Sequence, residues 1–301
     1  MAKYLVVVLG PTGVGKTDLS IALAERYNTS IVSSDSRQIY REMNVGTAVP
    51  EQEYLDRVKH YFIGDLSIHD YYNSWEYEKQ AVAKIEELHK SSDVVLLVGG
   101  SMMYIDAVCN GIDDIPTIDP QLRADILKKY EEEGLESIRM QLKQLDPVFY
   151  DEVDLKNAKR VIHAVEVCLM AGKPYSSMRT NKGRERSFEI IKLGLNRDRE
   201  ELYDRINKRV DIMFADGLED EARSLYPYKS LNSLNTVGYK ELFGYFNGEY
   251  DFEEAVRLIK RNSRRYAKRQ LSWFNRDESI QWFNPDNEAE ILNALDKRIQ
   301  L

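Results

Sequence analysis

Eight consecutive residues near the N-terminus have the types and the order that bind phosphate groups. They complete the pattern G-x-x-x-x-G-K-[ST] and are Gly10, Pro11, Thr12, Gly13, Val14, Gly15, Lys16 and Thr17. In such a loop the glycines let successive backbone N–H groups point at one spot, the lysine adds a positive charge, and the hydroxyl holds Mg²⁺ on the phosphates. The sequence therefore predicts a phosphate-binding loop, the P-loop, at residues 10–17.

The P-loop requires a strand before it and a helix after it, and the sequence supplies both. The apolar run at residues 4–9 predicts a buried strand, and residues 16–27 predict a helix whose N-terminus favours anions. Further strands are expected at 30–34, 93–98 and 188–195, and further helices at 76–90 and 198–215. Alternating strands and helices are typical of the α/β class, so we expect a P-loop NTPase-like core with a parallel sheet flanked by helices.

A second part of the chain, residues 112–187, has a different pattern. It contains charged segments with helical spacing at 120–133, 135–143 and 158–171, broken by prolines and without a strand pattern. We therefore predict a mainly α-helical insertion domain at 112–187, inside a P-loop-type catalytic core formed by residues 1–111 and 188–301.

The composition excludes several classes of protein. Of the 301 residues, 43% are hydrophobic and 31% charged, which is typical of a globular protein rather than a disordered one. No apolar run approaches the roughly 20 residues of a membrane span, and no cleavable signal precedes the first strand. The cysteines and histidines lack metal-ligand spacing, so no zinc site is expected. We expect a cytoplasmic location, no membrane association and no obligate protein partner.

Positive charge is concentrated near the C-terminus, although the net charge is −8. Eight cations and no acid lie between Arg257 and Arg276, and we call this segment the basic stripe. Spacings of three and four residues place Arg261 and Arg265 on one side of a helix. A surface that faces a polyanion is one interpretation, and a solvated helix neutralised by acidic neighbours is the other.

The acidic residues differ from those of an ordinary nucleotide hydrolase. Such enzymes usually offer an acid at the end of a second strand, where it helps to hold magnesium. Here the strand at 93–98 has Asp93 at its start and ends in Gly99, Gly100 and Ser101. Asp35 follows the strand at 30–34 instead, and the carboxyl ends of parallel strands share one edge of a sheet. We therefore expect Asp35 to face the P-loop, and phosphate binding without nucleotide hydrolysis is an alternative.

Several segments together resemble the tRNA dimethylallyltransferase family. They are residues 10–17, 35–40, 45–48, 99–101, 198–199, 202–209 and 238–242. The resemblance spans nearly the whole chain, and the combination of Asp-Ser-x-Gln-x-Tyr at 35–40 with Gly-Tyr-Lys-Glu at 238–241 is specific. The chain departs from the family at Met102, where a small residue is common. Because it ends at Leu301 without the zinc-finger extension of eukaryotic members, we expect the bacterial type.

The resemblance implies transfer of a dimethylallyl group from its diphosphate to N6 of adenosine 37 in tRNA. An exocyclic adenine amine is a weak nucleophile and needs a base, for which Asp35 is the candidate. The departing diphosphate suits the P-loop amides, Lys16 and a Mg²⁺ ion bound through Thr17 and phosphate oxygens. The resemblance adds Arg205 and Arg209 as diphosphate ligands and Ser101 as a further catalytic residue.

The resemblance also implies contacts with the anticodon stem-loop of tRNA, in which adenine 37 must leave its stack to reach the site. These contacts are assigned to Asp35, Ser36, Arg37, Gln38, Ser101, Arg123, Lys159, Arg160, Val161, Ile162 and His163. The basic stripe adds Arg261 and Arg265 as expected contacts with the RNA backbone. For residues 159–163, a packed helix with one cationic face is the alternative.

Three other functions remain open from the sequence. An adenylate isopentenyltransferase would share the diphosphate site but modify free AMP, ADP or ATP; the long insertion and the basic stripe favour tRNA. A small-molecule P-loop kinase would turn over ATP without dimethylallyl diphosphate. A non-catalytic RNA-binding protein would bind tRNA without chemistry.

Overall fold

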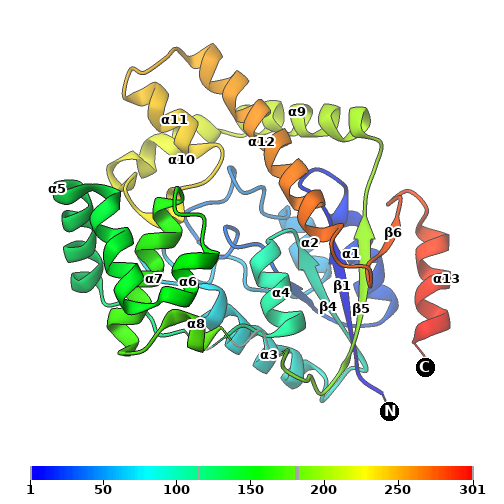
Figure 1. Ribbon diagram of the computed structural model, residues 1–301. Coiled ribbons are helices and arrows are strands. Elements are labelled where there is room, and N and C mark those ends of the chain that lie inside the picture. Colours follow the sequence, from blue (N-terminus) through cyan, green and yellow to red (C-terminus); the bar gives the residue numbers. More distant parts are fainter. Residues whose placement is uncertain (1, 114, 180–182, 300–301) are drawn as a thin grey trace. The chain divides into compact units, whose positions relative to one another are not determined.

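The computed structural model describes residues 2–113, 115–179 and 183–299 (Figure 1). The chain divides into two compact units, and we describe each separately. The core unit comprises Met1–Cys109 and Glu185–Leu301, and the helical unit comprises Asn110–Arg184. Within the described ranges, no helix has both the length and the apolar composition needed to cross a membrane.

A six-stranded sheet, parallel throughout, organises the core unit. The strands lie in the order β3-β2-β4-β1-β5-β6. Their bounds are β1 Tyr4–Leu9, β2 Ile31–Ser33, β3 His60–Tyr61, β4 Val94–Gly99, β5 Glu189–Leu195 and β6 Gln281–Phe283. Leu9 lies opposite Gly99 on one side and Gly194 on the other, so β1, β4 and β5 end at the same level. The predicted α/β class with a parallel sheet flanked by helices is confirmed.

Helices cover both faces of this sheet (Figure 1). They are α1 Lys16–Arg26, α2 Gln52–Arg57, α3 Ser74–Leu88, α4 Met102–Asn110, α9 Arg199–Ala215, α10 Leu218–Leu225, α11 Tyr239–Phe246, α12 Phe252–Phe274 and α13 Glu288–Arg298. Two short 3₁₀ turns, Tyr226–Tyr228 and Asn232–Leu234, lie between α10 and α11.

The alternating direction of the side chains along β1 explains why a separate hydrophobic core forms on each face of the sheet. Successive side chains of a strand point to opposite faces. Leu5 and Val7 pack in a cluster that contains Tyr77 of α3. Val6 and Val8 pack in a second cluster with apolar side chains of α1 and α13. Because every β1 residue is buried, this strand anchors the P-loop that follows it.

The helical unit has its own core. Its helices are α5 Pro120–Leu145, α6 Pro147–Glu152, α7 Ala158–Ala171 and α8 Tyr175–Met178, and no strand occurs in its described residues. The backbone of Gly134 leaves the helical region at φ 78° and divides α5, at the boundary between the predicted helices 120–133 and 135–143. Ile138 and Leu142 of α5 pack with Val161 and Val165 of α7 in a single cluster.

Candidate active site

The P-loop joins the end of β1 to the start of α1. Gly10, Gly13 and Gly15 have φ values of 155°, 79° and 105°, in the region that favours glycine. A Cβ on Gly13 would lie 2.9 Å from Ile206 of α9, so glycine also permits α9 to pack against the loop. The sequence pattern therefore folds into a tight turn that ends at the N-terminus of a helix, where anions bind favourably.

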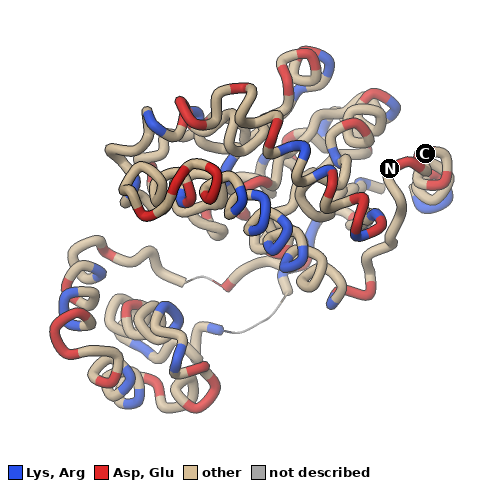
Figure 2. Tube along the Cα trace, turned by 90° about the horizontal axis from the view of Figure 1, so that it is seen from above, with Lys and Arg blue, Asp and Glu red and all other residues tan. Residues whose placement is uncertain are grey.

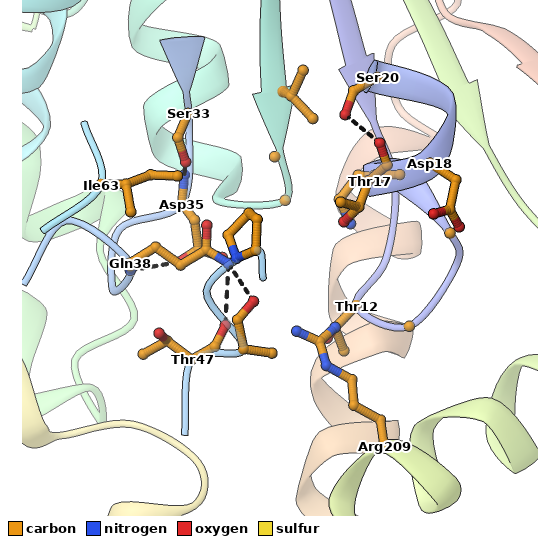
Figure 3. Close-up of a pocket in the computed structure, with 18 of the residues that line it drawn as sticks. Thr12, Thr17, Asp18, Ser20, Ser33, Asp35, Gln38, Thr47, Ile63 and Arg209 are labelled. Atoms are coloured by element: carbon orange, nitrogen blue, oxygen red, sulfur yellow. Dashed lines mark hydrogen bonds between the residues drawn. The ribbon is translucent and has the colours of Figure 1, made fainter. Parts of the chain in front are cut away.

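A cavity of about 460 Å³ opens beside the P-loop, and we call it the P-loop cavity. The close-up shows two facing walls (Figure 3). Thr12, Thr17 and Arg209 belong to one wall, and Asp35 and Gln38 belong to the other. The carboxyl ends of β1, β2 and β4 meet here, as expected for ligand sites in parallel α/β sheets.

Lys16 is buried within its own loop. Its Nζ atom donates to the carbonyl oxygens of Gly10 at 3.0 Å and Pro11 at 2.9 Å. Burial, and to a smaller extent Arg209, lowers the pKa of Lys16 to about 7, and Asp35 acts in the opposite direction. Burial also lowers the pKa of Arg209, again offset by Asp35. The site therefore concentrates positive potential that an anionic ligand would satisfy.

Two arginines of α9 reach the P-loop, as the sequence predicted for diphosphate ligands. Arg205 donates from Nε to the carbonyl oxygen of Gly13 at 3.0 Å. Arg209 donates from Nη1 to the Thr12 hydroxyl at 3.3 Å. Both line the P-loop cavity, so they lie where a bound diphosphate would meet them. Their role as diphosphate ligands stays a prediction.

Asp35 lies directly after β2 and is held by its own loop. Its Oδ1 atom accepts from the backbone N–H of Arg37 at 2.9 Å and of Gln38 at 3.3 Å. Ser101 supports the same turn, because its hydroxyl accepts from the backbone N–H of Ser36 at 2.8 Å. Asp93 lies at the opposite edge of the sheet, where it pairs with Lys3 at 2.8 Å. The geometry thus brings Asp35, and not Asp93, to the phosphate site.

A second cavity of about 570 Å³ adjoins the first, and we call it the outer cavity. Five residues line both cavities and so form the boundary between them: Thr12, Asp35, Thr47, Arg209 and Tyr266. The outer cavity also receives the cations Arg37, Lys240, Arg265 and Arg269. Burial and then Asp35 raise the pKa of Tyr266 to about 12, so its hydroxyl stays protonated beside this carboxylate.

The donor atoms beside the P-loop fit Mg²⁺ better than a soft metal. In the described part of the chain, no cluster of three or more His, Cys, Asp and Glu side chains is arranged to hold a metal. The P-loop cavity instead offers oxygen atoms, among them the Thr17 hydroxyl and the Asp35 carboxylate. Mg²⁺ commonly binds through one or two protein oxygens plus substrate phosphates. The predicted Mg²⁺ site at Thr17 is therefore compatible with this donor set.

The expected tRNA contacts of the helical unit lie in different environments. Lys159 and Arg160 are exposed and His163 is half-buried on α7. Val161 is fully buried and Ile162 is nearly so, because both belong to the hydrophobic core of the unit. The prediction that these two side chains contact tRNA is therefore wrong. Arg123 forms a bidentate pair with the buried carboxylate of Glu166, at 3.0 and 3.1 Å.

The basic stripe forms the greater part of α12, and its cations differ in their partners. Lys and Arg are interspersed with Asp and Glu over most of the trace (Figure 2). Arg257 pairs with Glu254, and Lys260 pairs with Asp211 of α9 at 2.5 Å. Arg261 contacts Asn262 at 3.1 Å. Arg265, Lys268 and Arg269 are exposed and form no ion pair with a described acid. The interpretation as an acid-paired helix thus holds for Arg257 and Lys260.

Three residues of the site were not predicted from the sequence. Gln270 is buried and connects two loops: its Oε1 atom accepts from Thr12 N at 2.9 Å, and its Nε2 atom donates to Gly100 O at 2.8 Å. Thr47 and Tyr266 lie on the boundary between the cavities. The only signal that could have found Thr47 is the segment 45–48, which carries part of the family resemblance. No local pattern marks Gln270.

Comparisons with known proteins identify relatives over the whole chain. Residues 38–277 match the family model described as IPP transferase. The chain is 57% identical over 295 residues to "tRNA dimethylallyltransferase 1" of Phocaeicola vulgatus, covering 98% of both chains. It is 58% identical over 295 residues to "tRNA dimethylallyltransferase 2" of Parabacteroides distasonis, covering 98% of this chain and 99% of the relative.

Two solved structures resemble this chain over nearly its whole length. The crystal structure of a tRNA isopentenylpyrophosphate transferase from Bacillus halodurans is 34% identical, with a TM-score of 0.71, covering 98% of this chain and 96% of that one. A eukaryotic dimethylallyltransferase acting on tRNA is 24% identical with a TM-score of 0.83, covering 99% of this chain and 80% of that one. The second likeness shows the fold alone.

Proposed function

Because this chain belongs to the IPP transferase family, we propose that it transfers a dimethylallyl group from dimethylallyl diphosphate to N6 of adenosine 37 in tRNA and releases diphosphate. The observation that carries this proposal is the position of Asp35. Its carboxylate lines both the P-loop cavity and the outer cavity, so one base can serve a donor on one side and an acceptor on the other.

The P-loop cavity suits the donor. The transfer breaks the bond between the allylic carbon and a diphosphate oxygen, and negative charge grows on the leaving group. Backbone N–H groups of the P-loop, Lys16 and Arg209 would stabilise that charge, since both side chains line the cavity. When bound beside Thr17, Mg²⁺ would neutralise part of the same charge. The apolar side chains of Ile63 and Val98 line the same cavity and suit the hydrocarbon end.

The outer cavity suits the acceptor. The adenine amine attacks the allylic carbon, a C–N bond forms, and one N6 proton passes to an acceptor. Asp35 is placed to accept it, since its Oδ2 atom makes no hydrogen bond within the described part of the chain. An adenine from a nucleic-acid loop can be unstacked at modest cost. The phosphates that flank it would meet Arg37, Lys240, Arg265 and Arg269.

Nucleotide hydrolysis is less well supported by the same site. The end of β4 carries Gly99, Gly100 and Ser101 in place of the acid that usually helps to hold magnesium in nucleotide hydrolases. An adenylate isopentenyltransferase uses the same donor chemistry, so the acceptor must be decided by experiment.

One assay separates these functions. The protein is incubated with dimethylallyl diphosphate labelled in its allyl group, Mg²⁺ and either bulk tRNA or AMP. We expect label in tRNA, located at adenosine 37 by nuclease digestion and mass spectrometry, and none in AMP. Label in AMP alone would identify an adenylate isopentenyltransferase. In a parallel incubation with ATP and Mg²⁺ but without dimethylallyl diphosphate, turnover of ATP together with no transfer to tRNA would contradict the proposal and favour a kinase.

A further inference from the structure

Two of the segments that resemble the family, residues 45–48 and 238–242, meet in the core unit. Glu221 of α10 joins them. Its carboxylate accepts from the backbone N–H groups of Asn44 at 2.8 Å, Val45 at 2.8 Å and Gly46 at 2.9 Å. The same carboxylate accepts from the Tyr239 hydroxyl at 2.6 Å. Four donors thus converge on one side chain, and we call this arrangement the Glu221 clamp.

The clamp is tight on the side of Tyr239. Tyr239 is fully buried, and burial, followed by Glu221, raises its pKa well above the usual value, so the hydroxyl remains a donor. A Cβ on Gly46 would lie 2.6 Å from the Tyr239 ring and hydroxyl, so only glycine fits at this position. Ala48 has a φ of 47°, which is uncommon for a residue other than glycine and persists only where the surroundings fix the backbone. The loop 44–48 is therefore held in one conformation.

The fixed loop in turn orients Gln38. The Nε2 atom of Gln38 donates to the carbonyl oxygens of Thr47 at 3.1 Å and Ala48 at 3.0 Å (Figure 3). Both acceptors are carbonyl oxygens, so the NH₂ group of the side-chain amide must face them, and this fixes the orientation of the amide. The Oε1 atom consequently presents only an acceptor, and Gln38 lines the P-loop cavity next to Asp35. The backbone N–H of Gln38 also donates to Asp35 at 3.3 Å.

We propose that Glu221 is a positioning residue of the transfer reaction. It fixes loop 44–48, which orients the amide of Gln38 and steadies the Asp35 carboxylate beside the acceptor amine. Glu221 itself lines neither cavity, so it acts through the loop and not by contact with substrate. The expected effect of Glu221 on the transfer rate rests on the proposed function. The chain of hydrogen bonds from Glu221 through loop 44–48 to Gln38 does not depend on it.

The test compares Glu221→Gln with a matched control, Glu42→Gln. Glu42 also holds a loop, through the Ser67 hydroxyl at 2.7 Å and the Ile68 N–H at 3.0 Å, but neither Ser67 nor Ile68 lines the P-loop cavity or the outer cavity. A glutamine at 221 replaces one acceptor oxygen by an NH₂ group that faces backbone N–H donors. We expect single-turnover transfer to fall by about 10-fold to 100-fold, the cost of small misplacement, with an unchanged KM for dimethylallyl diphosphate. Glu42→Gln should transfer normally.

The connection from Glu221 to Gln38 can also be tested without measuring activity, by amide hydrogen exchange and NMR. Hydrogen exchange of the Asn44, Val45 and Gly46 amides should become at least about 10-fold faster in Glu221→Gln, and the side-chain amide resonances of Gln38 should shift. If Glu221→Gln does not fold, Tyr239→Phe removes one of the four donors and retains the ring, and it should produce the same changes at smaller size.

Each outcome decides the inference. Unchanged exchange and unchanged Gln38 resonances in Glu221→Gln overturn it, as does faster exchange with transfer at the rate of Glu42→Gln. A wild-type protein that modifies no tRNA would overturn the proposed function instead, and the exchange rates and Gln38 resonances would then still decide whether Glu221 positions this loop.

Discussion

The Nζ atom of Lys16 lies 3.0 Å from the carbonyl oxygen of Gly10, so the lysine donates to the loop that precedes it. A carbonyl is a weaker partner for an ammonium group than a phosphate oxygen, because it carries no full charge. Within the ranges that the structure describes, no charged acceptor contacts the buried lysine directly, and burial is the main cause that lowers its pKa to about 7. Binding of an anion should restore the charge.

We accordingly predict that diphosphate binding takes up a proton at Lys16. With a free-protein pKa of about 7, the lysine is largely neutral at about pH 8 and becomes protonated when the anion binds. Affinity should therefore fall with rising pH above about 7, by up to tenfold per pH unit, and lose this dependence below it. Titration calorimetry in buffers of different ionisation enthalpy measures the uptake. Lys16→Arg, which stays protonated, corrects for the ligand's own titration, and equal uptake by both proteins would contradict the prediction.

Asp35→Asn should separate chemistry from binding. The asparagine retains an oxygen for the N–H groups of Arg37 and Gln38 but cannot accept the N6 proton as a base. We expect tRNA affinity near that of the unchanged protein and a single-turnover transfer rate lower by roughly 10² to 10⁴, the range for loss of a positioned base. Filter binding and single-turnover kinetics on the same preparation give both values. A near-normal rate would remove Asp35 from the mechanism.

Gln270→Ala should destabilise the core unit. It would leave the N–H of Thr12 and the carbonyl of Gly100 without their present partner at a buried position. Such a loss costs about 1–3 kcal/mol in the free energy of unfolding. Gln52→Ala is the matched control, because Gln52 is exposed and its side chain hydrogen-bonds, among the described residues, only to Asp56 on its own helix. Its effect should stay within about 0.5 kcal/mol. Denaturant unfolding measures both, and equal effects would show that the Gln270 bridge contributes nothing.

The parts of the fold that could be predicted are those with a local signal. The strand at 4–9, the P-loop and the helix at 158–171 each carry their pattern in consecutive residues, and the structure has them at these positions. The strands β3 and β6 contain two and three residues, too few for an alternating pattern, and they form because a neighbouring strand offers hydrogen-bond partners.

The parts of the site that could not be predicted depend on residues far apart in the sequence. Gln270 lies 258 positions from Thr12, and the Glu221 carboxylate lies 175 positions or more from the amides that it holds. For Val161, the sequence left contact with tRNA and packing within a helix as alternatives, and the structure shows that the side chain is buried. Its helix presents a cationic and an apolar side within a few residues, and only the packing of α7 against α5 decides which side faces solvent.

The basic stripe gives the last prediction, because four of its eight cations form two matched pairs. Arg265 and Arg269 line the outer cavity and have no acidic partner among the described residues, whereas Arg257 and Lys260 are paired with Glu254 and Asp211. Contacts with RNA phosphates release counterions and make affinity depend on salt, while cations already paired with protein acids contribute little. Changing Arg265 and Arg269 to Gln should weaken all substrate tRNAs alike. The slope of log affinity against log salt should then fall by up to about 1.5, at ~0.7 to 0.9 for each contact.

The double change of Arg257 and Lys260 to Gln is the control and should leave that slope nearly unchanged. Affinity for dimethylallyl diphosphate should be the same in the unchanged protein and in both variants. Filter binding over a range of salt concentrations measures the slopes. If the second pair lowers the slope as much as the first, ion pairing within the protein does not decide which cations meet the RNA.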